Sequence, residues 1–269
     1  MMPATGLSGA RLLGLFVVAV YLLTYLPIAL VVLTSFNDAE LTKLPIEHYS
    51  TRWYASLFEN TKTLAALWTS IKLGLSSAIA ATILGLCAAL AAVRYEFPGK
   101  KAFLALMTLP MLAPGIVLGV SMLLFARQIG FQTGFRALLL GHTLLALPYC
   151  TFIIISSLAR FDRNLEDAAR GLGAGETQVL ARVTLPAIMP GIIGALLFGF
   201  TISIGEFVVS FFLTSAGTTT LPIRIYSIVR VGITPEINAV STLILAVTAV
   251  LTLAAIQLTW SRTNMKQGG

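Results

Sequence analysis

The sequence predicts an all-α membrane protein with six transmembrane helices, and two observations support this fold class. Hydrophobic residues make up 57% of the 269 residues and charged residues only 11%, whereas soluble domains contain roughly 45–50% and about 25%. The chain also contains six separate apolar stretches that reach the roughly 20 helical residues needed to cross a bilayer.

The six expected spans follow one another along the chain at about 12–35, 64–93, 102–126, 137–158, 191–213 and 236–260. The first is longer than the apolar region of a secretory signal, about 7–15 residues, and no small-residue cleavage site follows it, so we expect a retained anchor. Six spans place both termini on one side, and a modest excess of Lys and Arg there indicates the cytoplasm. We therefore expect one transmembrane domain over residues 1–269.

The composition excludes several other classes. The net charge of +7 is spread over the loops rather than gathered into a stripe, which favours contact with anionic lipid headgroups over nucleic acid. Cys87 and Cys150 both lie in apolar spans and indicate neither a disulfide framework nor a metal site.

No enzymatic motif is present in the sequence. His48 and His142 are its two histidines, too far apart for a zinc-protease motif, and no nucleophile elbow occurs. The Gly99-Lys100 pair is followed by Lys101 instead of Ser or Thr, so there is no phosphate-binding loop. Energy for active transport would have to come from a partner or an ion gradient.

The segment between the fourth and fifth spans, about 159–190, is more ordered than a simple connection. Asp162 can cap a short helix, and Gly173 follows where a left-handed C-cap is expected. Gly175 adds a second break before another short helix from Glu176 to Val183, and Pro190 suits the first turn of the fifth span. The apolar stripe of the first helix consists of Leu165, Ala168, Ala169 and Leu172.

This stripe needs a cover, since a helix of about ten residues is marginal in water. One alternative is that the helix lies flat on the membrane surface. The stripe is mostly alanine, however, and small side chains permit the close approach of a helix seated in a protein groove. Glu166, Asp167 and Arg170 lie on the opposite side. We therefore favour docking into a partner protein.

The same loop resembles the cytoplasmic signature of permease subunits of ABC importers, which reads Glu-Ala-Ala, three residues, Gly, nine residues, then Ile-x-Leu-Pro. Asp167-Ala168-Ala169, Gly173, Val183 and Leu185-Pro186 match it at the right spacing. Segments such as WYASLF and RYEFPGK are similar to the spermidine/putrescine branch, in particular its second membrane subunit. The resemblance implies ATPase-coupling residues at Glu166, Asp167, Ala168, Ala169, Arg170, Gly171, Gly173, Leu185 and Pro186.

The resemblance also implies an architecture and partners. It predicts a MetI-like core of helices 2–6 with helix 1 wrapped outside, in a multi-pass protein of the bacterial inner membrane. The implied partners are a related permease, forming a heterodimer, two cytoplasmic ATP-binding subunits and an extracytoplasmic solute-binding protein. The chain itself would bind no cofactor, because ATP and magnesium belong to the ATPases. The loop helix would be the coupling helix, seated in the ATPase cleft.

Glu206 is the candidate for the substrate path because it is the one acidic residue deep in a span, where a carboxylate is costly and by default functional. Ser203 and Ser210 flank it at helical spacing and are expected to share its face. The structural alternative is that Glu206 pairs with Lys72 or with a helix-end amide.

The substrate class stays open at this point. Polyamine permeases tend to carry two adjacent acids here and another after the proline of the third span, whereas this chain has Gly205 before Glu206 and Gly115 after Pro114. Several carboxylates favour a polycation most strongly. A polyamine, a monocation, a zwitterion such as an amino-acid derivative, and an anion all remain candidates.

The outer connection after the fifth span carries Leu221-Pro222 and then an amphipathic run with Arg224 and Arg230. We expect a short interfacial helix whose arginines contact the solute-binding protein, with surface solvation as the alternative. Among whole-protein functions, a stand-alone secondary carrier or channel is the alternative to an ABC permease; it would show inverted repeats or paired intramembrane charges. A membrane enzyme is a third class and would need a nucleophile with a base.

Overall fold

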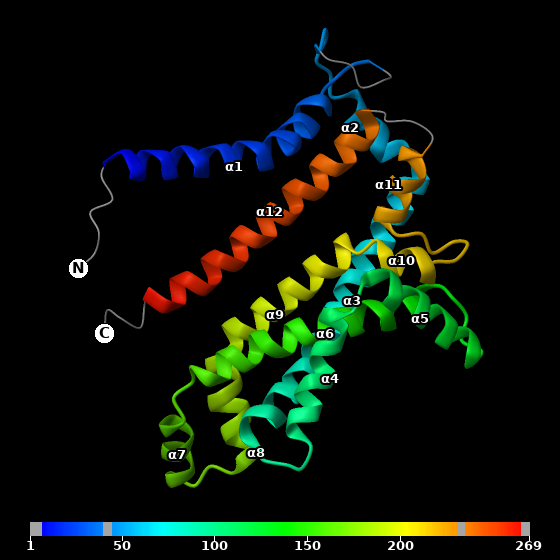
Figure 1. Cartoon of the computed structure of the whole chain (residues 1–269). Coiled ribbons are helices and arrows are strands. Elements are labelled where there is room, and N and C mark those ends of the chain that lie inside the picture. The colour runs from blue at the N-terminus through cyan, green and yellow to red at the C-terminus, as the bar shows by residue number, and fades with distance from the viewer. Residues whose placement is uncertain (1–6, 40–44, 231–234, 265–269) are drawn as a thin grey trace. The chain divides into compact units, whose positions relative to one another are not determined.

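The computed structural model describes residues 7–39, 45–230 and 235–264. The regular secondary structure of these residues is helical, and they contain no strand beyond an isolated bridge between Asn37 and Tyr49. The predicted all-α class is therefore confirmed. In order the helices are α1 (Leu7–Thr34), α2 (Arg52–Glu59), α3 (Thr61–Arg94), α4 (Lys100–Leu112), α5 (Gly115–Gln128), α6 (Phe135–Ala159), α7 (Asn164–Gly171), α8 (Glu176–Val179), the π-helix η1 (Leu180–Thr184), α9 (Leu185–Gly205), α10 (Val208–Leu213), α11 (Leu221–Val229) and α12 (Pro235–Asn264) (Figure 1).

Four of the expected spans correspond to long apolar helices, namely α1, α3, α6 and the continuous helical stretch Glu176–Gly205. Within the described residues this count rises to five if α4 and α5 together make one bent span. The apolar part of α12 that the structure describes, Pro235–Val250, is shorter than a full span. The total of six therefore stays a prediction.

The third span is not the single helix expected over 102–126. α4 and α5 meet at an angle of 107°, and the break lies at Ala113 and Pro114. Ala113 is extended, with φ −74° and ψ 135°, because a proline disfavours the helical conformation of the residue before it. The sequence carried this signal at Pro114, but apolar continuity outweighed it in our prediction.

The chain divides into two compact units, Met1–Thr61 with Ser227–Val247 and Lys62–Tyr226 with Thr248–Gly269. The single domain over 1–269 and the wrapping of the first helix around the others stay predictions. The candidate coupling loop and Glu206 both belong to the second unit.

The core of the second unit forms where α3, α6 and α9 pack together. Many of its fully buried residues are small, including Ala81, Ala89, Ala146 and Ala195. Small side chains let helix backbones approach closely, which is how helices associate when lipid removes the hydrophobic drive between them. A second cluster joins α3, α6 and α10 around Leu73, Leu138, Val209 and Leu213.

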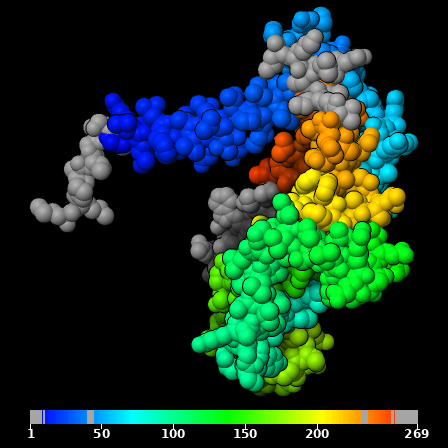
Figure 2. Space-filling view, turned by 45° about the vertical axis from the view of Figure 1, so that its right-hand side comes forward, coloured from blue at the N-terminus to red at the C-terminus, as the bar shows by residue number. Residues whose placement is uncertain are grey.

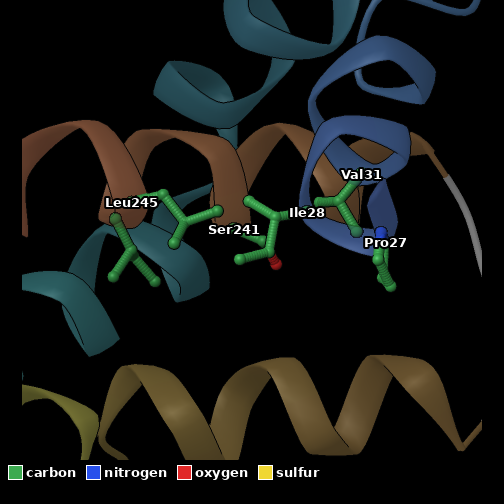
Figure 3. A pocket seen from close by; sticks show the side chains of 6 residues that line it. Pro27, Ile28, Val31, Ser241 and Leu245 are labelled. Carbon is green, nitrogen blue, oxygen red and sulfur yellow. The ribbon is translucent and has the colours of Figure 1, made fainter. Parts of the chain in front are cut away.

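In the first unit, α1 exposes its side chains from residue 11 to residue 30 (Figure 2). Its C-terminal end is tied to the start of α12, because the Asn238 side chain donates a hydrogen bond to the Thr34 hydroxyl at 2.9 Å. An open apolar cleft of about 400 Å³ lies between the two helices. Its lining contains no charged residue, so the cleft is no candidate for a solute site (Figure 3); it consists of Pro27, Ile28, Val31, Ser241, Ile244 and Leu245.

The packing of α6 against α10 predicts that Gly141→Ala destabilises the protein. A Cβ at Gly141 would come within 2.8 Å of both Leu213 Cδ1 and Val209 Cγ1, and overpacking of this kind costs about 1–3 kcal/mol. Thermal unfolding in detergent should show a midpoint several degrees lower. Gly14→Ala is the matched control, because it is also helical and a Cβ there meets nothing within 4 Å. Equal midpoints for the two variants would contradict the packing argument.

Candidate functional site

The candidate coupling helix is α7. It starts at Asn164, whose N–H donates to the Asp162 carboxylate at 3.0 Å. The N-cap is Arg163 rather than the expected Asp162, which lies one residue earlier. The helix ends in a paired backbone motif: Gly173 N–H donates to Arg170 O at 2.9 Å and Ala174 N–H to Ala169 O at 3.1 Å. Gly173 has φ +87°, which confirms the predicted left-handed cap.

Glu166 alone is buried in α7, at 5% exposure. Its carboxylate forms an ion pair with Arg94 at the end of α3 and accepts a hydrogen bond from the Thr184 hydroxyl. Arg94 Nη2 also donates to Thr184 Oγ1 at 3.1 Å. The polar side of α7 is thus partly held by the membrane helices of its own chain, and a buried charge with this many partners is satisfied.

The apolar stripe faces the other way. Leu165 is 51% and Leu172 91% exposed, and Ala168 is also exposed, while Ala169 is half-buried. Asp167, Gly171 and Gly173 of the signature are exposed as well. A short helix with Glu166 inside and with Leu165 and Ala168 outside leaves an uncovered surface of the kind that a partner groove accepts.

Arg170 closes the turn between α7 and α8. Its guanidinium donates to Asp167 Oδ1 at 2.8 Å and to Glu176 Oε1 at 2.7 Å, and it lies 3.6 Å from Glu166 Oε2. The hydrogen bond from Arg170 lowers the pKa of the Glu176 carboxyl, and the same bond raises the pKa of Arg170. The charges of this turn therefore persist at neutral pH.

The connection from this turn into the membrane is continuous helix. α8 leads into η1 and then α9, so the helix expected to stop at Val183 runs on to Gly205. Pro186 occupies the first turn of α9, whereas Pro190, expected there, lies inside the helix. Gly175 precedes α8 in an extended conformation, with φ −75° and ψ 161°. The half-buried Leu185 and exposed Pro186 thus lie on a rigid link.

The expected span 191–213 is interrupted at Glu206. α9 ends at Gly205, Glu206 is extended with ψ 113°, and α10 starts at Val208. The Glu206 carboxylate accepts the N–H of Val209 at 2.9 Å, so it caps α10 at the end where a negative charge is favourable. Glu206 is half-buried, and Lys72 is exposed with no ion pair among the described residues. Of the two structural pairings considered, the helix-end amide is present.

Ser203 and Ser210 flank this break, but their side chains lie in the core. His142 of α6 joins them: its Nδ1 lies 2.7 Å from Ser203 Oγ and its Nε2 2.9 Å from Ser210 Oγ. Ser77 of α3 donates to Ser203 at 3.0 Å. All four side chains are buried, so in this structure the serines tie α9 and α10 to α6 and do not line an open path.

The two outer arginines differ in their surroundings. Arg224 lies on α11, is half-buried, and its Nε approaches Thr63 Oγ1 at 3.5 Å. Arg230 follows the end of that helix and is exposed. The expected interfacial helix is present as Leu221–Val229.

Sequence reasoning missed three residues of these sites. Arg94 and Thr184 were not selected, although Arg94 ends a span inside the RYEFPGK segment and directly precedes a turn. The hydrogen-bond partners of His142 were not identified either. Thr184 lies 18 residues from Glu166, and the other partners lie 61 to 90 residues apart along the chain, so no local pattern reveals such contacts.

Comparisons with known proteins agree with this geometry. A sequence profile of the family described as "binding-protein-dependent transport system inner membrane component" matches residues 81–267. The spermidine/putrescine transport system permease protein PotC of Escherichia coli K12 is 34% identical over 260 residues, 97% of this chain and 98% of PotC. The putrescine transport system permease protein PotI of the same strain is 37% identical over 234 residues, 84% and 83% of the two chains.

A solved structure shares the fold. It is a bacterial alginate ABC transporter in complex with an alginate pentasaccharide-bound periplasmic protein, at a TM-score of 0.69 and 16% identity, covering 91% of this chain and 92% of that one. The relatives are transport subunits, so neither the membrane enzyme nor the stand-alone carrier or channel is supported. The chain belongs to the family of inner-membrane components of binding-protein-dependent transport systems and is a permease subunit of an ABC importer.

Proposed function

We propose that this permease pairs with a related permease and imports an organic cation of the polyamine class. Two ATP-binding subunits, which carry ATP and magnesium, drive the import, and an extracytoplasmic solute-binding protein delivers the cation. Both termini lie in the cytoplasm, on the side of the ATPases. The observation that carries this proposal is α7, whose Leu165 and Leu172 are exposed while Glu166 is held inside.

The coupling helix has the properties of a docking element. Its backbone is capped at both ends, Arg170 braces the turn that follows it, and its apolar stripe has no cover within the described part of the chain. In the proposed cycle, ATP binding closes the ATPase dimer and moves the seated helix. The rigid α8–η1–α9 connection then carries the movement into the membrane, as rigid-body rocking requires.

The substrate class rests on two independent supports. The relatives PotC and PotI are named for spermidine and putrescine transport. Glu206 places one carboxylate, half-buried, at a helix break inside the membrane, where a single fixed negative charge favours an ammonium group over a neutral or anionic one. Arg224 and Arg230 are proposed contacts for the solute-binding protein.

The docking role predicts that Gly173→Val reduces uptake and co-purification of the ATPase. Valine at φ +87° is strained, because β-branched residues rarely adopt the left-handed region, and the cap that orients α7 is lost. Gly175→Val is the matched control in the same loop, with φ −75° and open space around its Cβ. Radiolabelled putrescine uptake and ATPase pull-down at equal expression check this. Unchanged uptake and association in Gly173→Val would reject the docking role.

The cation site predicts that Glu206→Gln raises the KM for putrescine and spermidine about tenfold, since a charged hydrogen bond contributes about 1.5–3 kcal/mol. Glutamine keeps an oxygen that can accept the Val209 N–H, so the α10 cap survives and only the charge is removed. Glu96→Gln is the control, because Glu96 is an exposed partner of Lys100 at 2.7 Å. An unchanged KM for both cations in Glu206→Gln would exclude a role for its charge.

A further inference from the structure

Three elements meet at a buried cluster on the inner side of the loop: the end of α3, α7 and the end of η1. Arg94 supplies one guanidinium nitrogen, Nη2, that serves both the Glu166 carboxylate and the Thr184 hydroxyl, and Thr184 in turn donates to Glu166. Thr184 is fully buried, the Glu166 side chain is 6% exposed and the Arg94 side chain 21%. Each of the three side chains contacts the other two.

The cluster decides where α7 points. Glu166 is the one buried residue of that helix, so the buried contact between α7 and the bundle is made by a carboxylate. A second hydrogen bond, from Arg163 Nη2 to Val93 O at 3.0 Å, joins the start of the same loop to the end of α3. The attachment of α7 to the membrane helices is therefore polar and directional rather than hydrophobic.

The cluster also lies where the helix geometry changes. Thr184 is the last residue of η1, and α9 starts at the next residue. Single π-helical turns inside α-helices are frequently found at functional positions. Glu166 thus connects α7 to two places at once, Arg94 at the end of α3 and Thr184 directly before α9.

We propose that Arg94, Glu166 and Thr184 form a mechanical joint that transmits the movement of the coupling helix to α3 and α9. The inference rests on the proposed function and deepens it. The three side chains are positioning residues: they do not contact ATP or the transported solute, and they act by keeping α7 aligned while it moves. A hydrophobic contact would resist separation but tolerate rotation, whereas a three-way hydrogen-bonded contact fixes the angle as well.

The test exchanges the charges of Arg94 and Glu166 and measures how efficiently ATP hydrolysis is coupled to putrescine uptake. Arg94→Glu and Glu166→Arg are made singly and together in the full transporter, reconstituted in liposomes with its ATPases and solute-binding protein. Putrescine taken up per ATP hydrolysed is the readout, alongside ATPase co-purification and basal ATP hydrolysis. We expect each single variant to lose about tenfold in putrescine taken up per ATP hydrolysed. The double variant, which restores an ion pair, should recover to within about threefold of the wild type.

Two further variants keep the test decisive. Thr184→Val preserves the volume and the ion pair but removes the hydroxyl, and should lower uptake per ATP by about threefold. Glu96→Gln removes the exposed ion pair with Lys100 and should change nothing.

The proposed joint is rejected if the single variants take up as much putrescine per ATP hydrolysed as the wild type. It is also rejected if the double variant assembles but does not recover this ratio. A loss of ATPase association that the double variant does not reverse would assign the cluster to assembly alone and would also reject it. No ATP-driven putrescine uptake by the wild-type assembly would instead reject the proposed function, and the joint with it.

Discussion

The close packing of α3, α6 and α9 is the constraint on which the rest of the second unit depends. Small residues such as Ala81, Ala146 and Ala195 are completely buried in it, and they let backbones approach at a distance that larger side chains would prevent. Because the helices are this close, polar groups between them are stabilised where they bond to one another. His142 with Ser203 and Ser210 is such a case, with both ring nitrogens bound.

Helix breaks in this protein occur where freed backbone groups find a partner. An interrupted helix at membrane depth leaves N–H and C=O groups without water, so each break must be satisfied by the protein itself. At the α9–α10 break the Glu206 carboxylate accepts the Val209 N–H, and Ser210 donates to the Glu206 carbonyl at 2.9 Å. Glu206 therefore satisfies backbone groups at the break and also places a negative charge within the bundle. A helix break of this kind can in this way serve as a binding site.

The candidate coupling loop reverses the usual arrangement of a short amphipathic helix, in which the apolar side is buried and the charged side is exposed. In α7 the charged Glu166 faces the membrane helices and the apolar Leu172 faces outward. The inversion follows from the partners of Glu166, the half-buried Arg94 and the buried Thr184, which compensate a carboxylate that would otherwise be costly to bury. A helix that exposes its apolar residues and is bound to its own chain by a polar contact is suited to docking into a partner protein at a fixed angle.

The sequence by itself determined the helical class, the long apolar helices, the family signature around Asp167 and the left-handed cap at Gly173, because these depend on composition, local periodicity and backbone preference. The bend at Pro114 had a local signal in the sequence, whereas the tertiary structure alone decided which side of α7 is buried, the interruption at Glu206 and the partners of His142. Residues 102–126 and 191–213 are largely apolar, so one continuous helix was predicted in each range and the breaks at Pro114 and Glu206 were missed. These features depend on residues far apart in the chain, such as Arg94 and Glu166, whose contact exists only once α3 and α7 are brought together.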